Sequence, residues 1–348
     1  MKKKKKKLGV GIIGLGRIFP RHLHDSIKKI KELELSAVCD VSKQTAAKIG
    51  KKEKVPYYTD YKKLICNKDV DIIAVCTPNI FHYEIGMEIA KKGKHCIMEK
   101  PIAQDFKQAE KLVKAFKKSK GKLFPVLQVR YNPAVQILKE HVKRGSLGKI
   151  LTASLIIRWT RPQEYFSKSN WKGTKKMDGG SLLTQSIHYI DVMQYILGKA
   201  KSVFGKADNV LLNIETEDIA NAIIDFNCGA RANLEFTICT YPHNLECSLA
   251  VLGETGTVKL GGIAMNEIEV WEVKNVPRPR VVQGIAPNVY DGGTYVGSCP
   301  NHASIYKNMI DVLVYKKKSF IKAEDVLESL RIIDGIKKSS KEKKEVIV

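Results

Sequence analysis

The sequence predicts an α/β protein with a doubly wound parallel sheet at its N-terminus and a following α+β domain built on a mostly antiparallel sheet. Three observations predict this class. Continuous apolar runs alternate with helical patterns in the first third of the chain. A glycine-rich turn follows the first of these runs. After about residue 131, strand-like runs with hairpin signals follow one another.

The expected parallel strands are apolar throughout, as is typical of strands covered by helices on both faces. They occupy residues 8–13, 35–40, 70–77, 95–99 and 122–129. Helical patterns lie between them, for example at residues 83–92 and 106–118. Repeated strand–helix units with short links indicate a doubly wound sheet.

The second part of the chain reads as antiparallel strands with a few helices. Strand-like runs cover residues 151–160, 222–241, 246–260 and 266–273, with hairpin signals at 228–229 and 254–256. Helices are expected at residues 133–144, 188–197, 303–315 and 323–338. The first of these ends at Gly145, a common helix stop.

The length allows two domains, because single hydrophobic cores stop growing near roughly 250–300 residues and the chain has 348. We expect three parts. Residues 1–7 form a disordered lysine tail, residues 8–130 a dinucleotide-binding domain, and residues 131–348 a domain for substrate binding and oligomerisation.

The charge balance raises the possibility of a nucleic-acid-binding protein. Lys and Arg total 60 against 36 Asp and Glu, a formal net charge of +24. However, only ten of these cations are Arg, the residue that reads guanine edges and clamps phosphate in a planar fork. The lysines are scattered over helical patterns and are not interleaved with aromatic residues. The composition therefore favours a lysine-rich solvated surface and no nucleic-acid partner.

Cysteine usage and hydropathy indicate a reducing compartment, and we expect a cytoplasmic protein. The eight cysteines include no CxxC pair, and Cys39, Cys76 and Cys96 lie in apolar strand-like runs. We expect neither a metal site nor a disulfide framework. No apolar run approaches the roughly 18 residues of a membrane span, and the basic start lacks the cleavage site of a secretion signal.

Residues 11–19, GIIGLGRIF, carry the pattern of a phosphate-binding turn. Gly14 allows a tight turn, and Gly16 allows the backbone to approach a pyrophosphate closely. Asp40 ends the second strand, where an acid accepts the ribose hydroxyls and repels the extra phosphate of NADP; the alternative is a cap of the following helix. These features predict a Rossmann domain that binds NAD. Phe19 departs from the pattern, because a small residue normally packs there.

Two further strand ends lie at the edge where ligands bind in open parallel sheets. Thr77, Pro78 and His82 follow the run at 70–77 and are candidates to line the dinucleotide groove, although a plain turn explains each of them as well. Glu99-Lys100-Pro101 ends the run at 95–99, against the expected nicotinamide. A solvated Glu–Lys pair at a loop start is the alternative there.

These motifs together resemble the glucose–fructose oxidoreductase / inositol dehydrogenase / MocA family of sugar dehydrogenases, over about residues 8–340. The resemblance implies that Lys100 sits beside the reacting hydroxyl and that Pro101 follows a cis bond. Desolvation beside an apolar nicotinamide lowers the pKa of a lysine, so that it becomes a usable acid or base. The resemblance also extends the expected cofactor contacts to Arg17, Ile18, Asn79, Glu99, Lys100 and Gln128.

The resemblance continues through Asp178-Gly179-Gly180 and through His188 and Asp191, which share a helix face. It implies that His188 points into the cleft, supported by Asp191; a core histidine is the alternative. Many relatives carry an Asp where this chain has Thr184. Proton transfer therefore falls on Lys100 and His188, in either order, and Thr184 and Gln185 at most contact substrate.

Long stretches at 159–174 and 240–272 resemble one branch of the family, the UDP-N-acetylglucosaminuronate 3-dehydrogenases. An anionic substrate suits a chain that places Arg130, Arg158 and Arg161 near site segments, because guanidinium pairs with carboxylate and diphosphate. Neutral hydrogen bonds are expected from Gln163, Tyr165 and Asn244, although Tyr165 fits a core or interface role equally well. Weaker candidates are Asn301, His302 and Tyr306.

The branch implies NAD-dependent oxidation at C3 of UDP-N-acetylglucosaminuronic acid for surface-polysaccharide synthesis, with the NADH recycled in place by 2-oxoglutarate. The family pattern and an open-faced second sheet imply a homodimer or homotetramer. The alternative enzyme is a dehydrogenase of a free sugar or inositol. A non-catalytic NAD- or sugar-binding relative is a further alternative, disfavoured by the presence of both Lys100 and His188.

Overall fold

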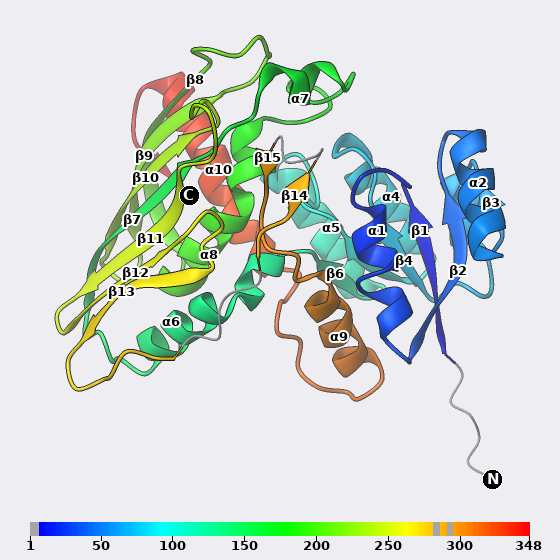
Figure 1. Ribbon diagram of the computed structural model, residues 1–348, viewed down its shortest axis with the longest axis horizontal. Helices are drawn as coiled ribbons and strands as arrows, with labels where there is room; N and C mark the ends of the chain where they lie inside the picture. The colour runs from blue at the N-terminus through cyan, green and yellow to red at the C-terminus, as the bar shows by residue number, and fades with distance from the viewer. Residues whose placement is uncertain (1–6, 281–285, 291–294) are drawn as a thin grey trace. The chain divides into compact units, whose positions relative to one another are not determined.

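The computed structural model describes residues 7–280, 286–290 and 295–348 (Figure 1). The expected lysine tail falls outside this range except for Lys7. The chain divides into two compact units. Unit 1 comprises Met1–Val126 and His302–Glu324, and unit 2 comprises Leu127–Asn301 and Asp325–Val348.

Unit 1 is built on a six-stranded sheet in the order β3-β2-β1-β4-β5-β6, with every neighbouring pair parallel. This confirms the predicted doubly wound fold. The strands are β1 (Leu8–Ile13), β2 (Leu33–Cys39), β3 (Tyr57–Tyr58), β4 (Ile72–Val75), β5 (His95–Met98) and β6 (Leu123–Pro125). The helices are α1 (Phe19–Leu23), α2 (Lys43–Glu53), α3 (Tyr61–Ile65), α4 (Ile80–Lys91), α5 (Phe106–Lys118) and α9 (His302–Leu313), with a 3-10 turn η1 (Ile27–Lys29).

Local sequence explains most of these boundaries. The Ser42 side chain caps α2 by accepting from the Thr45 N–H, and Asp105 caps α5 by accepting from the Gln108 N–H. All four residues of β4 are buried, as a strand between two helical layers requires. The sixth strand is shorter than expected and ends at Pro125, which is tolerated because β6 is an edge strand; the Val126 N–H still donates to the Met98 carbonyl. A 3-10 turn, η2 (Gln128–Tyr131), follows in unit 2.

Unit 2 is built on an eight-stranded sheet in the order β13-β12-β11-β7-β10-β9-β8-β16. Its pairs are antiparallel except for β7 and β10, which are parallel, so the prediction of a mostly antiparallel sheet is confirmed. The strands are β7 (Ile150–Arg158), β8 (Ala200–Asp208), β9 (Ile219–Phe226), β10 (Arg231–Thr237), β11 (Glu246–Gly253), β12 (Gly256–Gly261), β13 (Glu267–Val273) and β16 (Val346–Ile347). A two-stranded ribbon pairs β14 (Val289–Tyr290) with β15 (Tyr295–Val296).

Helices α6 (Pro133–Lys143), α8 (Ile187–Leu197) and α10 (Asp325–Glu342) pack against strands β12, β7 and β8 of this sheet. The unit also contains α7 (Gln163–Ser167), and a π-helix, η3 (Leu182–Ser186), runs directly into α8. Along β7, Ala153, Leu155 and Ile157 are buried, while the residues between them are half-exposed. This period of two means that the second face of the sheet is open. None of the helices in the described ranges combines the length and the apolarity needed to cross a membrane.

A buried ion pair joins three helical segments of unit 2. The Arg130 guanidinium in η2 donates from Nε and one terminal nitrogen to the Asp191 carboxylate of α8, at 2.6 and 2.7 Å, and from the other to Asp325 of α10, at 2.8 Å. Arg130 and Asp191 are 2% and 1% exposed. Gln194 and Ser329 donate to the same Asp191 oxygen. Removal of one partner would therefore leave a buried charge unpaired.

We predict that Arg130→Gln lowers the free energy of unfolding of unit 2 by roughly 3–5 kcal/mol, because Asp191 then lacks its counter-charge. Urea unfolding followed by tryptophan fluorescence reads this unit, since all three tryptophans, at 159, 171 and 271, lie in it. Arg231→Gln is the control, because its bidentate pair with Asp225 is mostly solvated. Equal unfolding midpoints for the two variants would contradict this account.

Candidate functional site

The glycine turn after β1 has the geometry that a dinucleotide requires. Gly14 has φ +91°, and a Cβ there would lie 2.7 Å from the carbonyl carbon and oxygen of Cys76. A Cβ on Gly16 would meet no atom within 4 Å, so Gly16 borders open space. The Thr77 hydroxyl is buried and has no hydrogen-bond partner among the described residues. These residues fit a diphosphate that packs against the turn and accepts from Thr77.

Asp40 braces this turn from the end of β2. Its Oδ2 accepts from the Leu15 N–H and its Oδ1 from the Ser42 N–H, both at 2.9 Å. The helix cap of α2 is Ser42 and not Asp40. Each carboxylate oxygen has a second lone pair, which leaves Asp40 able to accept from ribose hydroxyls as predicted.

The other predicted cofactor residues of unit 1 lie around the same turn. Arg17 and Ile18 stand between Gly16 and α1, and Pro78 and Asn79 stand at the start of α4. His82 is buried, and its ring nitrogens lie 2.6 Å from the Pro101 carbonyl oxygen and 2.8 Å from that of Thr77. Burial lowers its pKa. His82 therefore connects the loops that follow β4 and β5. The sequence predicted a cofactor contact for His82 and not this structural role.

The Glu99-Lys100-Pro101 motif follows β5, and the Lys100–Pro101 peptide is cis, as the resemblance implied. The Glu99 carboxylate points into unit 1. Its Oε1 lies 2.9 Å from His22 Nε2 of α1 and 3.1 Å from His302 Nε2 of α9, and its Oε2 accepts from the Lys100 N–H at 3.3 Å. The other His22 nitrogen lies 2.8 Å from the Tyr306 hydroxyl.

Electrostatics in this cluster favour an ion pair. Burial alone would raise the pKa of Glu99, but hydrogen bonds and charge from His22 and His302 hold it well below its usual value. Burial alone would lower the pKa of His22, but its contacts with Cys76 and Glu99 raise it to about 9. Burial raises the pKa of the Cys76 thiol, although the charge and the hydrogen bond of His22 act in the opposite direction.

Sequence reasoning missed His22 entirely and ranked His302 and Tyr306 low. His22 lies one turn beyond the glycine motif, where no pattern marks it. The three side chains His22, Glu99 and His302 also form a set whose ligand atoms lie within 4.8 Å of one another, close enough to hold a metal ion. The sequence had indicated no metal site.

In unit 2 the structure brings together four of the predicted substrate residues. Arg161 donates from Nε to the Gln185 amide oxygen at 2.9 Å, and the Gln185 amide donates to the Tyr165 hydroxyl at 3.3 Å. The Asn244 amide oxygen accepts from the Thr160 N–H at 2.8 Å, and its nitrogen donates to the Val296 carbonyl, as Arg161 also does.

Aromatic rings surround this group. The Arg161 guanidinium lies over the rings of Trp159, Tyr165 and Tyr295, at 4.7–5.6 Å from their centroids. The Lys172 ammonium lies 3.7 Å from the centroid of the Tyr165 ring. Cations held over aromatic faces keep their charge while they are partly desolvated. We refer to Arg161, Tyr165, Lys172, Gln185 and Asn244 as the cationic cluster.

The predicted His188 lies in the first turn of α8, three residues after Gln185, and is buried with 3% of its surface exposed. The π-helix η3 precedes it. Thr184 uses its hydroxyl within this π-helix, donating to the Gly180 carbonyl at 3.0 Å. π-Helical turns are frequent at functional sites. The Asp191 carboxylate pairs with Arg130. Support of His188, which the resemblance implied, is therefore not its only role.

Four other residues that were predicted to bind substrate or cofactor have partners within unit 2. Arg130 is committed to two carboxylates inside unit 2, so we no longer assign it to substrate. Arg158 lies on the open face of the sheet, opposite buried Ile157, and pairs with Glu235 and Glu246. Gln163 bridges to the backbone of Asn213 in both directions. Gln128 belongs to η2 in unit 2, where its amide donates to the Ser298 hydroxyl.

Comparison with known proteins connects this geometry to an oxidoreductase family. Residues 8–126 match the model of the family's NAD-binding Rossmann fold, and residues 139–348 match that of its C-terminal alpha/beta domain. A curated relative, the inositol 2-dehydrogenase/D-chiro-inositol 3-dehydrogenase of Lactiplantibacillus plantarum, is 28% identical over 260 residues, 72% of this chain and 71% of the relative.

Two solved structures are similar over nearly the whole chain. The WlbA dehydrogenase from Bordetella pertussis in complex with NADH and UDP-GlcNAcA is 27% identical, with a TM-score of 0.88 over 99% of each chain. The WlbA dehydrogenase from Chromobacterium violaceum, in complex with the same two ligands, is 29% identical, with a TM-score of 0.89 over 99% of this chain and 97% of that one. The Rossmann match and these neighbours show that unit 1 binds NAD.

Substitutions of the two glycines of the turn should affect different properties, stability at Gly14 and cofactor binding at Gly16. We expect Gly14→Ala to lower the melting temperature of the NAD-free protein, because its Cβ meets backbone and its φ disfavours a side chain. Gly16→Ala should leave that temperature unchanged and yet weaken NADH at least tenfold, because its Cβ occupies the cofactor's space. Thermal unfolding and fluorescence titration with NADH measure the two effects. Unchanged NADH affinity in Gly16→Ala would contradict the placement.

Stability of unit 1 should depend on pH through His22. A folded-state pKa of about 9, against 6.5 for an ordinary histidine, gives stability that is complete below pH 6.5 and lost as the pH rises through 9. The Glu99 contribution has the opposite sign and disappears only in acid. A urea series at pH 6, 7.5 and 9, read by hydrogen-exchange mass spectrometry of unit 1 peptides, should show a decline that His22→Gln removes.

Proposed function

The chain belongs to the GFO/IDH/MocA oxidoreductase family, and we propose that it oxidises the C3 hydroxyl of UDP-N-acetylglucosaminuronic acid to the 3-keto sugar, with NAD as hydride acceptor. The broader activity, that of an NAD-dependent sugar oxidoreductase, follows from the family and from the dehydrogenases the chain resembles. The observation that carries the specific substrate is the match to two WlbA dehydrogenases, both in complex with NADH and UDP-GlcNAcA, over 99% of this chain.

The cationic cluster supports an anionic substrate. Arg161 supplies a buried positive charge: its Nε donates to Gln185, one terminal nitrogen donates to the Thr160 and Val296 carbonyls, and three aromatic rings hold it in orientation. Gln185, Tyr165 and Asn244 add neutral donors and acceptors of the kind that sugar hydroxyls and an acetamido group require. A free inositol has no negative charge for Lys172 and Arg161 to meet.

The chemistry needs a hydride acceptor and a proton acceptor. NAD, when bound at the glycine turn, takes the hydride from the carbinol carbon. The hydroxyl proton must leave at the same stage, and the proposal gives this task to Lys100 or His188, with the other group polarising the oxygen. The Glu99 carboxylate holds the Lys100 backbone N–H, and burial shields the His188 imidazole from water. Thr184 takes no part in proton transfer, since a hydroxyl committed to a helix carbonyl is a poor base.

A free-sugar or inositol dehydrogenase is the second candidate. It is favoured by the curated inositol dehydrogenase that is 28% identical to this chain. Both candidates use the same cofactor, so only the substrate distinguishes them.

An NADH-formation assay with UDP-N-acetylglucosaminuronate, UDP-N-acetylglucosamine and myo-inositol should give the highest kcat/KM for the first compound. Lys100→Ala and His188→Ala should each lower kcat by about 10²–10⁴-fold without loss of NADH binding. A matched exposed residue, Lys43→Ala on α2, should retain full activity. Addition of 2-oxoglutarate tests cofactor recycling in the same assay. A preference for an uncharged compound would transfer the assignment to the second candidate.

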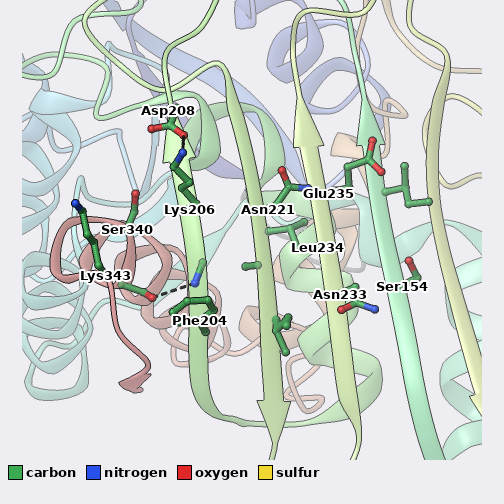
Figure 2. A pocket seen from close by; sticks show the side chains of 15 residues that line it. Ser154, Phe204, Lys206, Asp208, Asn221, Asn233, Leu234, Glu235, Ser340 and Lys343 are labelled. Carbon is green, nitrogen blue, oxygen red and sulfur yellow. Dashed lines mark hydrogen bonds and ion pairs between the residues drawn. The ribbon is translucent and has the colours of Figure 1, made fainter.

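The open face of the unit 2 sheet supports a homodimer or homotetramer as part of the proposal. A concavity of about 760 Å³ lies over strands β7 to β10 (Figure 2). Phe204 and Ile223 are 52% and 45% exposed there, beside Lys206, Asp208 and Lys343. Apolar side chains among charges of both signs form a surface that can pair with its own copy.

We expect light scattering after gel filtration to give a mass above one chain, and Ile223→Asp to shift it toward one chain, because a charge would be buried in the contact. Val41→Asp is the control, since Val41 is 93% exposed in unit 1. A wild-type protein that runs as a monomer at micromolar concentration would refute self-association through this face.

A further inference from the structure

The Glu99 carboxylate connects two histidines from distant parts of the chain to the backbone of Lys100. His22 and His302 are 0% and 1% exposed, and both place Nε2 within 3.1 Å of the same oxygen, Oε1. The second oxygen accepts from the Lys100 N–H. The carboxylate therefore has one side in contact with α1 and α9 and the other with the residue proposed to handle the proton.

We propose that His22 and His302 are positioning residues for Lys100: they fix the Glu99 carboxylate that holds the Lys100 backbone, and the positive charge of His22 balances the negative charge of Glu99. The inference rests on the proposed role of Lys100. No atom of His22 or His302 needs to touch the substrate. Their effect passes through Glu99.

The charge balance matters because of what an unbalanced carboxylate would do. A buried anion next to an ammonium stabilises the protonated lysine and raises its pKa, which makes the lysine a poorer base at neutral pH. An imidazolium on the opposite side of Glu99 offsets that attraction. The cluster thus holds the Lys100 backbone through a charged group without stabilising the protonated form of the lysine.

Other titratable groups face the cluster, and their states determine what a pH profile reports. Cys76, Cys96 and Tyr306 stay uncharged at neutral pH, because burial raises the pKa of each. Burial lowers the pKa of His82, which lies within electrostatic range of both Glu99 and Lys100. Asp25 lies within electrostatic range of His302 and pairs with Arg21. The charges that remain around Glu99 are its own and that of His22.

A metal ion is the competing explanation for two histidines and a glutamate. Tetrahedral zinc, with bonds near 2.0–2.1 Å, separates its ligand atoms by about 3.4 Å. Here both histidine nitrogens approach one shared oxygen at 2.9 and 3.1 Å, which are N–H···O distances. The geometry favours hydrogen bonds, and a bound metal becomes one outcome of the test.

The first experiment needs no turnover. Nitrogen-15 NMR of the histidine rings in the resting protein should show His22 as imidazolium at pH 7.5, and Glu99→Gln should lower its titration midpoint. Elemental analysis of protein purified without chelator accompanies it. A neutral His22 at pH 7.5, or one equivalent of metal per chain that His22→Gln removes, would overturn the proposal.

The second experiment compares kcat/KM against pH for His22→Gln and His302→Gln, with whichever sugar the wild type oxidises fastest. We expect kcat at pH 7 to fall about 10–100-fold, the acidic limb of the His22→Gln profile to move up by about one pH unit, and the Kd of NADH to stay within threefold. His24→Gln, an exposed histidine at the end of α1, is the matched control and should behave as wild type.

A lower melting temperature with unchanged kcat and an unchanged pH profile would show a merely structural role and refute the inference. Failure of the proposed function looks different. In that case Lys100→Ala keeps its turnover, while the NMR measurement still decides whether His22 and Glu99 form the ion pair.

Discussion

A buried charge must be paired, and this constraint shapes both units. In unit 1 the Glu99 carboxylate lies buried at the end of a parallel strand, and two histidines hold it from α1 and α9. In unit 2 the Arg130 guanidinium lies in η2, near the beginning of the unit's chain, and carboxylates from α8 and α10 hold it. Burial of each ion pair has a desolvation cost, which is offset only when several elements supply hydrogen bonds to the charged groups. The two charges therefore fix where the surrounding elements must stand.

The same constraint explains how the chain can place reactive groups accurately. Lys100 follows directly after Glu99, so the network that neutralises the carboxylate also restrains the lysine backbone. His188 occupies a helix whose next turn carries Asp191, the partner of Arg130. In both units a candidate proton carrier is adjacent to a structural ion pair. Rigid support of this kind is what positioning for catalysis requires.

Motifs made of neighbouring residues could be predicted from the sequence. The glycine turn and Asp40 depend on contacts within a few residues or on adjacent strand ends, and periodicity locates those ends. The cis Lys100–Pro101 peptide was expected only from the family resemblance. The grouping of Arg161 with Gln185 and Asn244 was expected only as a set of candidates, because sequence spacing does not show which side chains meet. Arg130 and Arg158 were assigned to substrate because Arg pairs well with anions, but acids inside the protein were the available partners.

The sequence by itself determined the class of each unit, the glycine turn and the strand end that carries Lys100, because these follow from local backbone geometry and hydrophobic periodicity. Only the tertiary structure decided the partners of the buried charges. His22 and His302 are 280 positions apart in the chain, and nothing in the residues around either one indicates the other. Their meeting at Glu99 results from helix α9, which belongs to unit 1 although it follows strands β7 to β13 of unit 2 in the chain. Long-range pairing of this kind depends on how the elements pack, and packing is a property of the folded chain as a whole.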